Sequence, residues 1–374
     1  METKSSSDVV IIGAGIIGCA IAYQLAKQGL TVTIVDRGNP GSEASSAAAG
    51  MLAPQAEATH GLKGPFSELC LASHRLYPQF VAEIVEQTGI EIAYRKPGTL
   101  FVATDYVEAE ALAGLLERQR AAGLPAEELT ADEVRHFEPA LAETVQVGVY
   151  LPEDHHVDNR RLVSALVVAA AQRGVTFITH TPVIDLMMDG DRVTGVRTPT
   201  GVIAGGTIVN AAGSWAGLVA PQLQKHIPVR PIRGQMLCLK QSTPSVRHLV
   251  YSGHCYLVPW PDGRTLVGAT MENVGYDKRI TAQGINHLLR AALALVPSLA
   301  EATITEMWAG LRPGTPDDRP ILGRIPGIEM IVATGHFRNG ILLAPITAKL
   351  IGELIVSGQP SISLEPFAPS RFLE

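Results

Sequence analysis

The chain has 374 residues, enough to bury a large core and to divide into two domains. Apolar residues make up 46% of it and charged residues 18%, the proportions of an ordinary globular protein. The net charge of −6 and the lack of a basic cluster argue against a nucleic-acid partner.

The cysteines and the lengths of the apolar runs indicate the cellular compartment of the protein. Cys19, Cys70, Cys238 and Cys255 are too few for a disulfide framework and lack metal-ligand spacing, so we expect a reducing, cytoplasmic compartment. The first residues lack the apolar core of a signal peptide. No apolar run approaches the roughly 20 residues of a spanning helix. We therefore expect no membrane association, and we expect a homo-oligomer.

The first forty residues carry a strong cofactor pattern. A short β-branched run precedes Gly13, Gly15 and Gly18, and small residues then recur at helical spacing. In such a loop Gly13 makes the tight turn, Gly15 lets a pyrophosphate approach the backbone, and Gly18 lets helix and strand pack closely. The next strand ends at Asp36, where a carboxylate can accept a hydrogen bond from a ribose hydroxyl. The pattern predicts a dinucleotide site, and the acid favours FAD or NAD over NADP.

Further stretches bear on which dinucleotide binds. Residues 45–52, SSAAAGML, are a run of small residues that is either a flexible loop or backbone lying against a flat ligand. Residues 207–217, TIVNAAGSWAG, predict a buried strand that returns to the cofactor and then a short helix. Residues 175–186 predict another strand, and Val183 lies where it could pass the adenine end.

A hairpin is predicted around 262–263, an Asp-Gly pair typical of a two-residue turn. Centring the turn there pairs Tyr256 with Ala269 and His254 with Met271, and these four side chains then share one face. A bulge near the turn would shift the register by one residue. The patch is either the wall of a pocket or a half-buried strand pair with a satisfied histidine.

Six motifs then occur together and in order: SSAAAGML, VNAAGSWAG, HCYLVP, VGATM, WAGLRPGTPD and GHFRNGILLAP. With the initial glycine fingerprint they resemble the flavin-dependent D-amino acid oxidase and sarcosine oxidase superfamily, and within it the bacterial glycine oxidase family. The resemblance covers nearly the whole chain.

The resemblance implies an α/β fold in which a Rossmann-like FAD-binding domain is interleaved with an α+β substrate domain built on a mainly antiparallel sheet. The FAD-binding domain would take residues 1–88, 147–227 and 304–374. The substrate domain would take residues 89–146 and 228–303. Alternating βα patterns in the first set and turn-separated strands over 228–273 agree with this division.

The resemblance also assigns a substrate site. Arg312 has apolar or small neighbours, so a buried guanidinium there needs an anion, and its planar fork would hold the substrate carboxylate. Tyr256 would donate to the same carboxylate, His254 and Met271 would contribute to the pocket wall, and Arg338 would lie between flavin and substrate.

FAD would bind to residues from the whole length of the chain. Residues 336–342 would bring a helix N-terminus to the pyrimidine end of the flavin, where backbone N–H groups stabilise the negative charge of the reduced ring. The motifs and the resemblance together place the cofactor against Gly13, Gly15, Ile16, Ile17, Gly18, Asp36, Arg37, Ala44, Ser45, Ser46, Ala49, Gly50, Met51, Val183, Ala212, Gly213, His336, Phe337, Arg338, Asn339, Gly340, Ile341 and Leu342.

We expect neither a covalent bond to the flavin nor a bound metal ion. Sarcosine oxidases link their flavin through a cysteine near the RPGTPD region, whereas the last cysteine here is Cys255, so we expect non-covalent FAD. His155 and His156 have the chemistry of metal ligands but precede Asp158-Asn159, a helix-start signal, so we expect no metal.

The implied activity is oxidative deamination of glycine and other small primary or secondary amino acids. Hydride passes from the α-carbon to flavin N5, water converts the imine to an oxoacid, and dioxygen reoxidises the flavin to give hydrogen peroxide. The resemblance also implies a link to thiamine thiazole biosynthesis. The alternatives are a D-amino acid oxidase or dehydrogenase, an oxidase of another N-substituted glycine, and a non-catalytic binding protein on the same fold.

Overall fold

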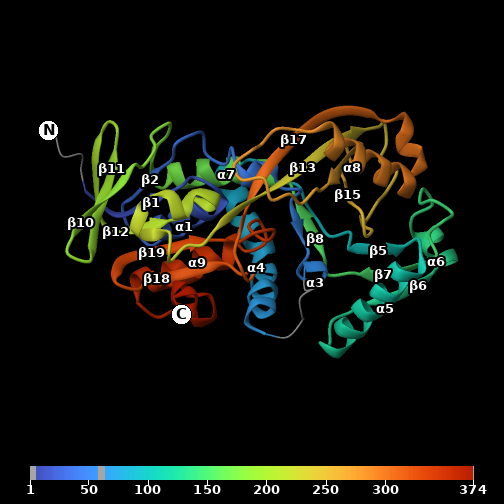
Figure 1. Cartoon of the computed structure of the whole chain (residues 1–374), viewed down its shortest axis with the longest axis horizontal. Coiled ribbons are helices and arrows are strands. Elements are labelled where there is room, and N and C mark those ends of the chain that lie inside the picture. The colour runs from blue at the N-terminus through green and yellow to red at the C-terminus, as the bar shows by residue number, and fades with distance from the viewer. Residues whose placement is uncertain (1–5, 58–63, 374) are drawn as a thin grey trace.

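The computed structural model describes residues 6–57 and 64–373. Two eight-stranded sheets lie side by side along the long axis of the molecule, with a small three-stranded sheet between them (Figure 1). The long strands β13 (Arg230–Lys240) and β17 (Thr303–Gly314) extend from the second sheet toward the first. The molecule therefore has two layered units that meet along these strands.

The first sheet is mainly parallel at its centre, as the fingerprint predicts. Val9 to Ile12 of its central strand are at most 5% exposed, which explains why that strand is continuously apolar. The strand order is β10 (Asp185–Asp189), β11 (Arg192–Thr198), β19 (Ile328–Thr334), β12 (Gly201–Asn210), β1 (Ser7–Ile12), β2 (Val32–Val35) and β9 (Thr176–Ile178), with β18 (Ile321–Ile325) paired to β19.

Four helices pack together beside this sheet and share one hydrophobic core with it. Their apolar residues recur at helical spacing and face one another, so each buries the stripe that its sequence predicts. They are α1 (Ile16–Lys27), α4 (Pro65–Thr88), α7 (Asn159–Gln172) and α9 (Ala344–Val356). The short helices α2 (Ala44–Ala47) and α3 (Pro54–Glu57) lie on the connection that leads from β2 to α4.

The second sheet is antiparallel except where β14 pairs in parallel with β5. Its order is β17, β13, β16 (Arg264–Gly268), β15 (Tyr256–Pro259), β14 (Leu249–Tyr251), β5 (Thr99–Ala103), β7 (Val147–Leu151) and β6 (Glu127–Thr130). The helices of this unit are α5 (Tyr106–Ala121), α6 (Ala131–Phe137) and α8 (Ala282–Leu295).

The small sheet joins the two units through β3 (Met51–Leu52), β8 (His155–Val157) and β4 (Tyr94–Arg95). Single turns of 3₁₀ helix occur at η2 (Gly213–Leu218), η3 (Pro221–Leu223), η4 (Pro297–Glu301), η5 (Glu365–Phe367) and η6 (Pro369–Phe372). A mainly parallel sheet beside a mainly antiparallel one confirms the predicted fold class.

Two strands belong to a different sheet from the one that the predicted domain boundaries imply. Residues 147–151 and most of 303–314 were assigned to the FAD-binding domain, yet β7 pairs with β5 and β6, and β17 pairs with β13. Their hydrogen-bonding partners put both strands in the second sheet. The division into two domains itself stays a prediction. In the part of the chain that is described, no helix is long and apolar enough to span a membrane.

Candidate active site

The glycine-rich loop connects β1 to α1 in a conformation that demands glycine. Gly13 has a φ of +104°, and a Cβ there would lie 2.6 Å from the Ala211 carbonyl oxygen. A Cβ on Gly18 would lie 2.0 Å from the Gly13 oxygen, so α1 could not approach β1 as closely. Helix α1 starts with no side-chain cap at Gly15, although the Ile16 N–H donates to Ser45 Oγ at 3.0 Å. The remaining N–H groups of this turn suit a pyrophosphate.

The Asp36 carboxylate accepts hydrogen bonds from the backbone of the glycine-rich loop and of the residues that follow β2. One carboxylate oxygen accepts from the Ala14 N–H at 2.6 Å, and the other accepts from the Gly38 N–H at 2.7 Å. Both oxygens retain further lone pairs, and the residue lines the cavity described next. Its contact with a ribose stays a prediction.

A cavity of about 580 Å³ runs from the glycine-rich loop to the second sheet. Twenty of the predicted cofactor residues line it: Gly13, Gly15, Ile16, Ile17, Asp36, Arg37, Ala44, Ser45, Ala49, Gly50, Met51, Val183, Ala212, Gly213, His336, Phe337, Arg338, Asn339, Gly340 and Ile341.

Three predicted cofactor residues do not line the cavity. Gly18 lies where α1 packs closely on β1. The Ser46 hydroxyl donates to the Glu43 carbonyl at 3.2 Å, and Leu342 is 1% exposed in the core. Their side chains are engaged in packing or in a local hydrogen bond, and their contacts with the cofactor stay predictions.

The segment before α9 forms a turn rather than a helix start. Residues 340–343 are in turns, and α9 begins only at Ala344. Phe337 adopts a φ of +47°. The N–H groups of Gly340, Ile341 and Leu342 donate to no backbone carbonyl within the described ranges. The predicted row of free donors is thus present, but it precedes the helix.

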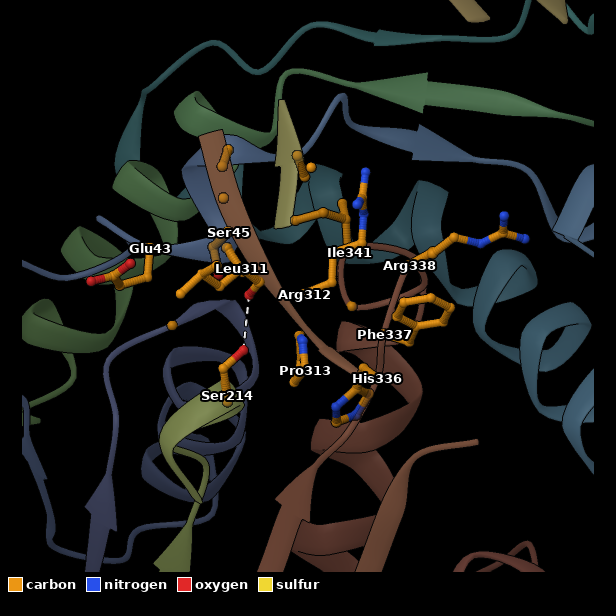
Figure 2. Close-up of a pocket in the computed structure, with 18 of the residues that line it drawn as sticks. Glu43, Ser45, Ser214, Leu311, Arg312, Pro313, His336, Phe337, Arg338 and Ile341 are labelled. Atoms are coloured by element: carbon orange, nitrogen blue, oxygen red, sulfur yellow. Dashed lines mark hydrogen bonds between the residues drawn. The ribbon is translucent and has the colours of Figure 1, made fainter. Parts of the chain in front are cut away.

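Arg312 extends from β17 at the same cavity, beside Leu311 and Pro313 (Figure 2). Its Nη1 donates to the Thr270 carbonyl at 3.1 Å. No carboxylate among the described residues forms an ion pair with it. The rest of the guanidinium fork is therefore available to an anionic ligand.

Two glycines that the sequence analysis missed allow close approaches beside this arginine, one by Arg312 itself and one by Ala47. Gly234 of β13 pairs with Gly310 of β17. A Cβ on Gly234 would lie 2.3 Å from Arg312 Nη1, and a Cβ on Gly310 would lie 2.5 Å from the Ala47 Cβ. Glycine inside a strand signals a close approach of this kind, and that signal was present in the sequence.

Tyr256 lines the cavity, but the predicted hairpin register is wrong by one residue. Tyr256 pairs with Gly268, not Ala269, because the turn is a three-residue loop over 261–263. Gly263, with a φ of +87°, supplies the left-handed residue of that loop. The phenol ring lies over Gly268, where a Cβ would come within 2.4 Å of it.

His254 and Met271 consequently do not face each other across the hairpin as predicted, and both side chains are exposed. The His254 side chain is 67% exposed, with Nε2 3.8 Å from Glu108 Oε1. Met271 is 60% exposed. Both residues still contribute to the outer lining of the cavity. The one-residue shift in register, together with the position of both residues beyond the strand ends, accounts for the difference.

Arg338 is also more peripheral than predicted. It is exposed, and its guanidinium extends away from that of Arg312 (Figure 2). Its Cζ lies 5.9 Å from the centre of the Phe337 ring. The backbone of Arg338 borders the cavity, but its side chain does not point at Arg312.

Burial keeps His336 and His155 neutral at ordinary pH. Burial lowers the pKa of His336 to about 3, and its Nε2 lies 3.0 Å from Thr347 Oγ1. His155 contacts His74 Nε2 at 2.9 Å and the Tyr94 hydroxyl at 2.7 Å, and burial lowers its pKa to about 3. No cluster of three or more possible metal ligands occurs within the described ranges.

The sequence analysis also missed a charged cluster at the glycine-loop end of the cavity. Glu43 accepts from Arg37 at 2.8 Å and from Lys278 at 2.9 Å. Arg37 in turn lies 3.6 Å from the centre of the Trp215 ring. Nothing in the spacing of these four residues connects them, so only the fold brings them together.

Comparison with known proteins agrees with this geometry. The profile of the family described as FAD dependent oxidoreductase matches residues 8–354. The chain is 36% identical to a glycine oxidase of Geobacillus kaustophilus, over 98% of this chain and 97% of that protein. The crystal structure of glycine oxidase from Geobacillus kaustophilus superposes with a TM-score of 0.94 at 36% identity, covering 98% of this chain and 99% of that one.

A longer relative is the bifunctional protein ThiO/ThiG of Synechocystis sp., which is 40% identical over 99% of this chain. The chain spans 55% of the length of that relative. A glycine-rich loop that fits a pyrophosphate and a row of free backbone donors agree with the matched profile, and the chain accordingly belongs to the family of FAD-dependent oxidoreductases that includes the D-amino acid oxidases.

Proposed function

We propose that this protein uses non-covalently bound FAD to oxidise glycine and other small primary or secondary amino acids. The observation that carries the proposal is the Arg312 guanidinium, which lies in the wall of the FAD cavity with one hydrogen bond to a backbone carbonyl and the rest of its fork free. A carboxylate is the planar anion that such a fork binds best. The high similarity to glycine oxidases supports the same substrate class.

The residues around Arg312 favour a small substrate. Tyr256 lies over Gly268, its hydroxyl 3.7 Å from Met236 Sδ, and the Tyr251 ring centre lies 5.4 Å from its own. Two aromatic rings and a thioether restrict the space beside the guanidinium. In the proposed site the Tyr256 hydroxyl donates to the substrate carboxylate that Arg312 holds.

The chain's own contribution to the chemistry is positioning. Bound FAD supplies the acceptor for a hydride from the substrate α-carbon. Burial lowers the pKa of His336 to about 3, which makes it a weak base, and its Nε2 contacts Thr347 Oγ1, so we do not assign it as the proton acceptor. Arg312 and Tyr256 fix the α-carbon in place, and a substrate bound with its amine neutral needs no side-chain base. Water then converts the imine to an oxoacid, glyoxylate from glycine, and dioxygen yields hydrogen peroxide.

Further proposals concern the cellular location, the oligomeric state and the pathway of the protein. We propose a cytoplasmic homo-oligomer, supported for the location by four cysteines that are all buried and free. A link to thiamine thiazole biosynthesis is supported by the resemblance to the ThiO/ThiG protein.

The test is a substrate screen on the pure holoenzyme. Glycine, sarcosine and short D-amino acids are mixed with it without oxygen, and flavin bleaching is followed at the visible absorption maxima. Peroxide is then measured with oxygen present. We expect bleaching and peroxide with glycine and a decline with side-chain size. A higher kcat/KM for D-phenylalanine than for glycine would instead identify a D-amino acid oxidase, and no bleaching by any amine would indicate a binding protein.

A further inference from the structure

Two hydroxyls of α4 contact the turn that precedes α9. The Tyr77 hydroxyl donates to the Ile341 carbonyl at 2.7 Å, and the Ser73 hydroxyl donates to the Leu342 carbonyl at 2.6 Å. Both side chains are fully buried, and they lie one helical turn apart on α4. They connect to a turn more than 260 residues away in the sequence.

These hydroxyls take the place of helical hydrogen bonds. In a continuous helix the Ile341 carbonyl would accept from residue 345, but Pro345 has no N–H. The Tyr77 hydroxyl fills that position at 2.7 Å, and the Ala344 N–H makes a longer hydrogen bond to the same carbonyl at 3.3 Å. The Leu342 carbonyl would accept from Ile346, but Ser73 Oγ lies between the two groups and also accepts from the Ile346 N–H at 3.4 Å.

The consequence concerns the direction of the peptide groups. In a trans peptide the C=O of one residue and the N–H of the next point in opposite directions. A hydroxyl that holds the Ile341 carbonyl toward α4 therefore turns the Leu342 N–H away from α4. Asn339, Gly340 and Ile341 of the same turn line the FAD cavity. The Tyr77 hydroxyl thus sets the direction of the Leu342 N–H, which has no backbone acceptor among the described residues. The Ser73 hydroxyl binds the next carbonyl, whose opposite N–H, that of Leu343, donates to the Asn339 carbonyl at 2.8 Å, so Ser73 acts by holding the same turn against α4.

We propose that Tyr77 and Ser73 are positioning residues that set the reduction potential of bound FAD. Neither residue is among those that line the cavity. They act through the N–H groups of residues 340–342, which would stabilise negative charge on bound, reduced FAD more than the neutral oxidised ring. The proposal rests on the proposed function only in that FAD occupies the cavity, and it is independent of which amine is the substrate.

The experiment measures the midpoint potential of FAD in the holoenzyme, reduced chemically against a reference dye without any amino acid. The variants are Tyr77→Phe and Ser73→Ala. Each removes one hydroxyl. Tyr77→Phe tests the direction of the Leu342 N–H, and Ser73→Ala tests how firmly the same turn is held against α4. The dissociation constant of oxidised FAD is measured in parallel with apoprotein.

The chain offers a matched control for each variant. Tyr23→Phe removes a buried phenol hydroxyl that lies 3.3 Å from Gln87 Oε1, away from the turn. Ser67→Ala removes a buried hydroxyl on the same helix α4 that has no hydrogen-bond partner among the described residues. Both controls reproduce the loss of a buried oxygen atom without touching residues 340–343.

We expect each test variant to disfavour the two-electron reduction of FAD by about two- to tenfold, the range of one hydrogen bond. Since tenfold corresponds to about 30 mV for a two-electron couple, the midpoint potential should fall by roughly 10–30 mV. Affinity for oxidised FAD should change much less than affinity for reduced FAD. Potentials equal to wild type in both test variants, or an equal fall in the controls, would overturn the proposal. Failure of glycine to bleach the flavin would count against the substrate assignment alone.

Discussion

Replacing Arg312 by alanine should separate substrate binding from cofactor binding. The guanidinium lies in the cavity wall, and its one hydrogen bond among the described residues is to the Thr270 carbonyl, so a substrate carboxylate would be its main anionic contact. Removing one partner of a buried charge pair costs about 3–5 kcal/mol. At about 1.4 kcal/mol per tenfold, kcat/KM for glycine should fall by about two to four orders of magnitude.

The assay compares two substrates in the same variant. Steady-state peroxide production gives kcat/KM for glycine and for a simple amine that lacks a carboxylate. The amine never uses the arginine, so it should lose little. Arg312→Lys keeps the charge without the fork and should fall between wild type and alanine. FAD content and the visible flavin spectrum should stay near wild type.

The ratio of the two losses in kcat/KM tests whether Arg312 binds the substrate carboxylate. A large loss for glycine with a small loss for the amine supports a substrate-binding arginine. Equal losses would refute the reasoning, because they would show that Arg312 supports the strand pair at Gly234 or the flavin, and not the carboxylate.

Three further predictions follow from the geometry. Asp36→Ala should raise the dissociation constant of FAD about 10- to 100-fold by fluorescence titration, since a charge-assisted hydrogen bond contributes roughly 1.5–3 kcal/mol; an unchanged constant would remove the ribose assignment. Acid precipitation should release yellow FAD into the supernatant, whereas colour retained in the pellet would indicate a covalent link. His156 and His336 have their pKa lowered by burial to about 3, so the unfolded chain binds more protons below pH 6.5. The free energy of unfolding should therefore fall by up to about 1.4 kcal/mol per pH unit for each histidine as the pH drops from 6.5 toward 3, and His156→Gln should reduce that slope in urea titrations.

The residues of the glycine-rich loop could be predicted because the constraints on them involve residues that are close together in the sequence. Gly13, Gly15 and Gly18 carry their conformational and packing requirements within one turn, and the acid at position 36 comes at the end of the adjacent strand. The same holds for the fold class, since buried and half-buried strands have different hydrophobic periods. These features needed no knowledge of distant contacts.

The substrate half was predicted less well because it depends on register and on distant neighbours. One extra residue in the loop at 261–263 makes Gly268 rather than Ala269 the partner of Tyr256 and takes Met271 out of register with His254. The pairing of Gly234 with Gly310 lies 76 positions apart in the sequence, and only the alignment of β13 with β17 reveals it. The start of α9 was misplaced because Pro345 cannot donate to the Ile341 carbonyl, and distant hydroxyls of α4 bind the Ile341 and Leu342 carbonyls instead.

The strand order of the first sheet has a consequence for biosynthesis. Strand β1 pairs with β2 at once, but its other neighbour, β12, is about 190 residues later, and β19 joins that edge only at Ile328. At roughly 5–20 residues per second, the ribosome takes on the order of 10–40 s to make β12 after β1. During that interval Val9 to Ile12 have an uncovered edge, which is the kind of surface that chaperones recognise and that aggregates. Cofactor loading must wait longer still, because the turn before α9 is among the later segments to leave the ribosome.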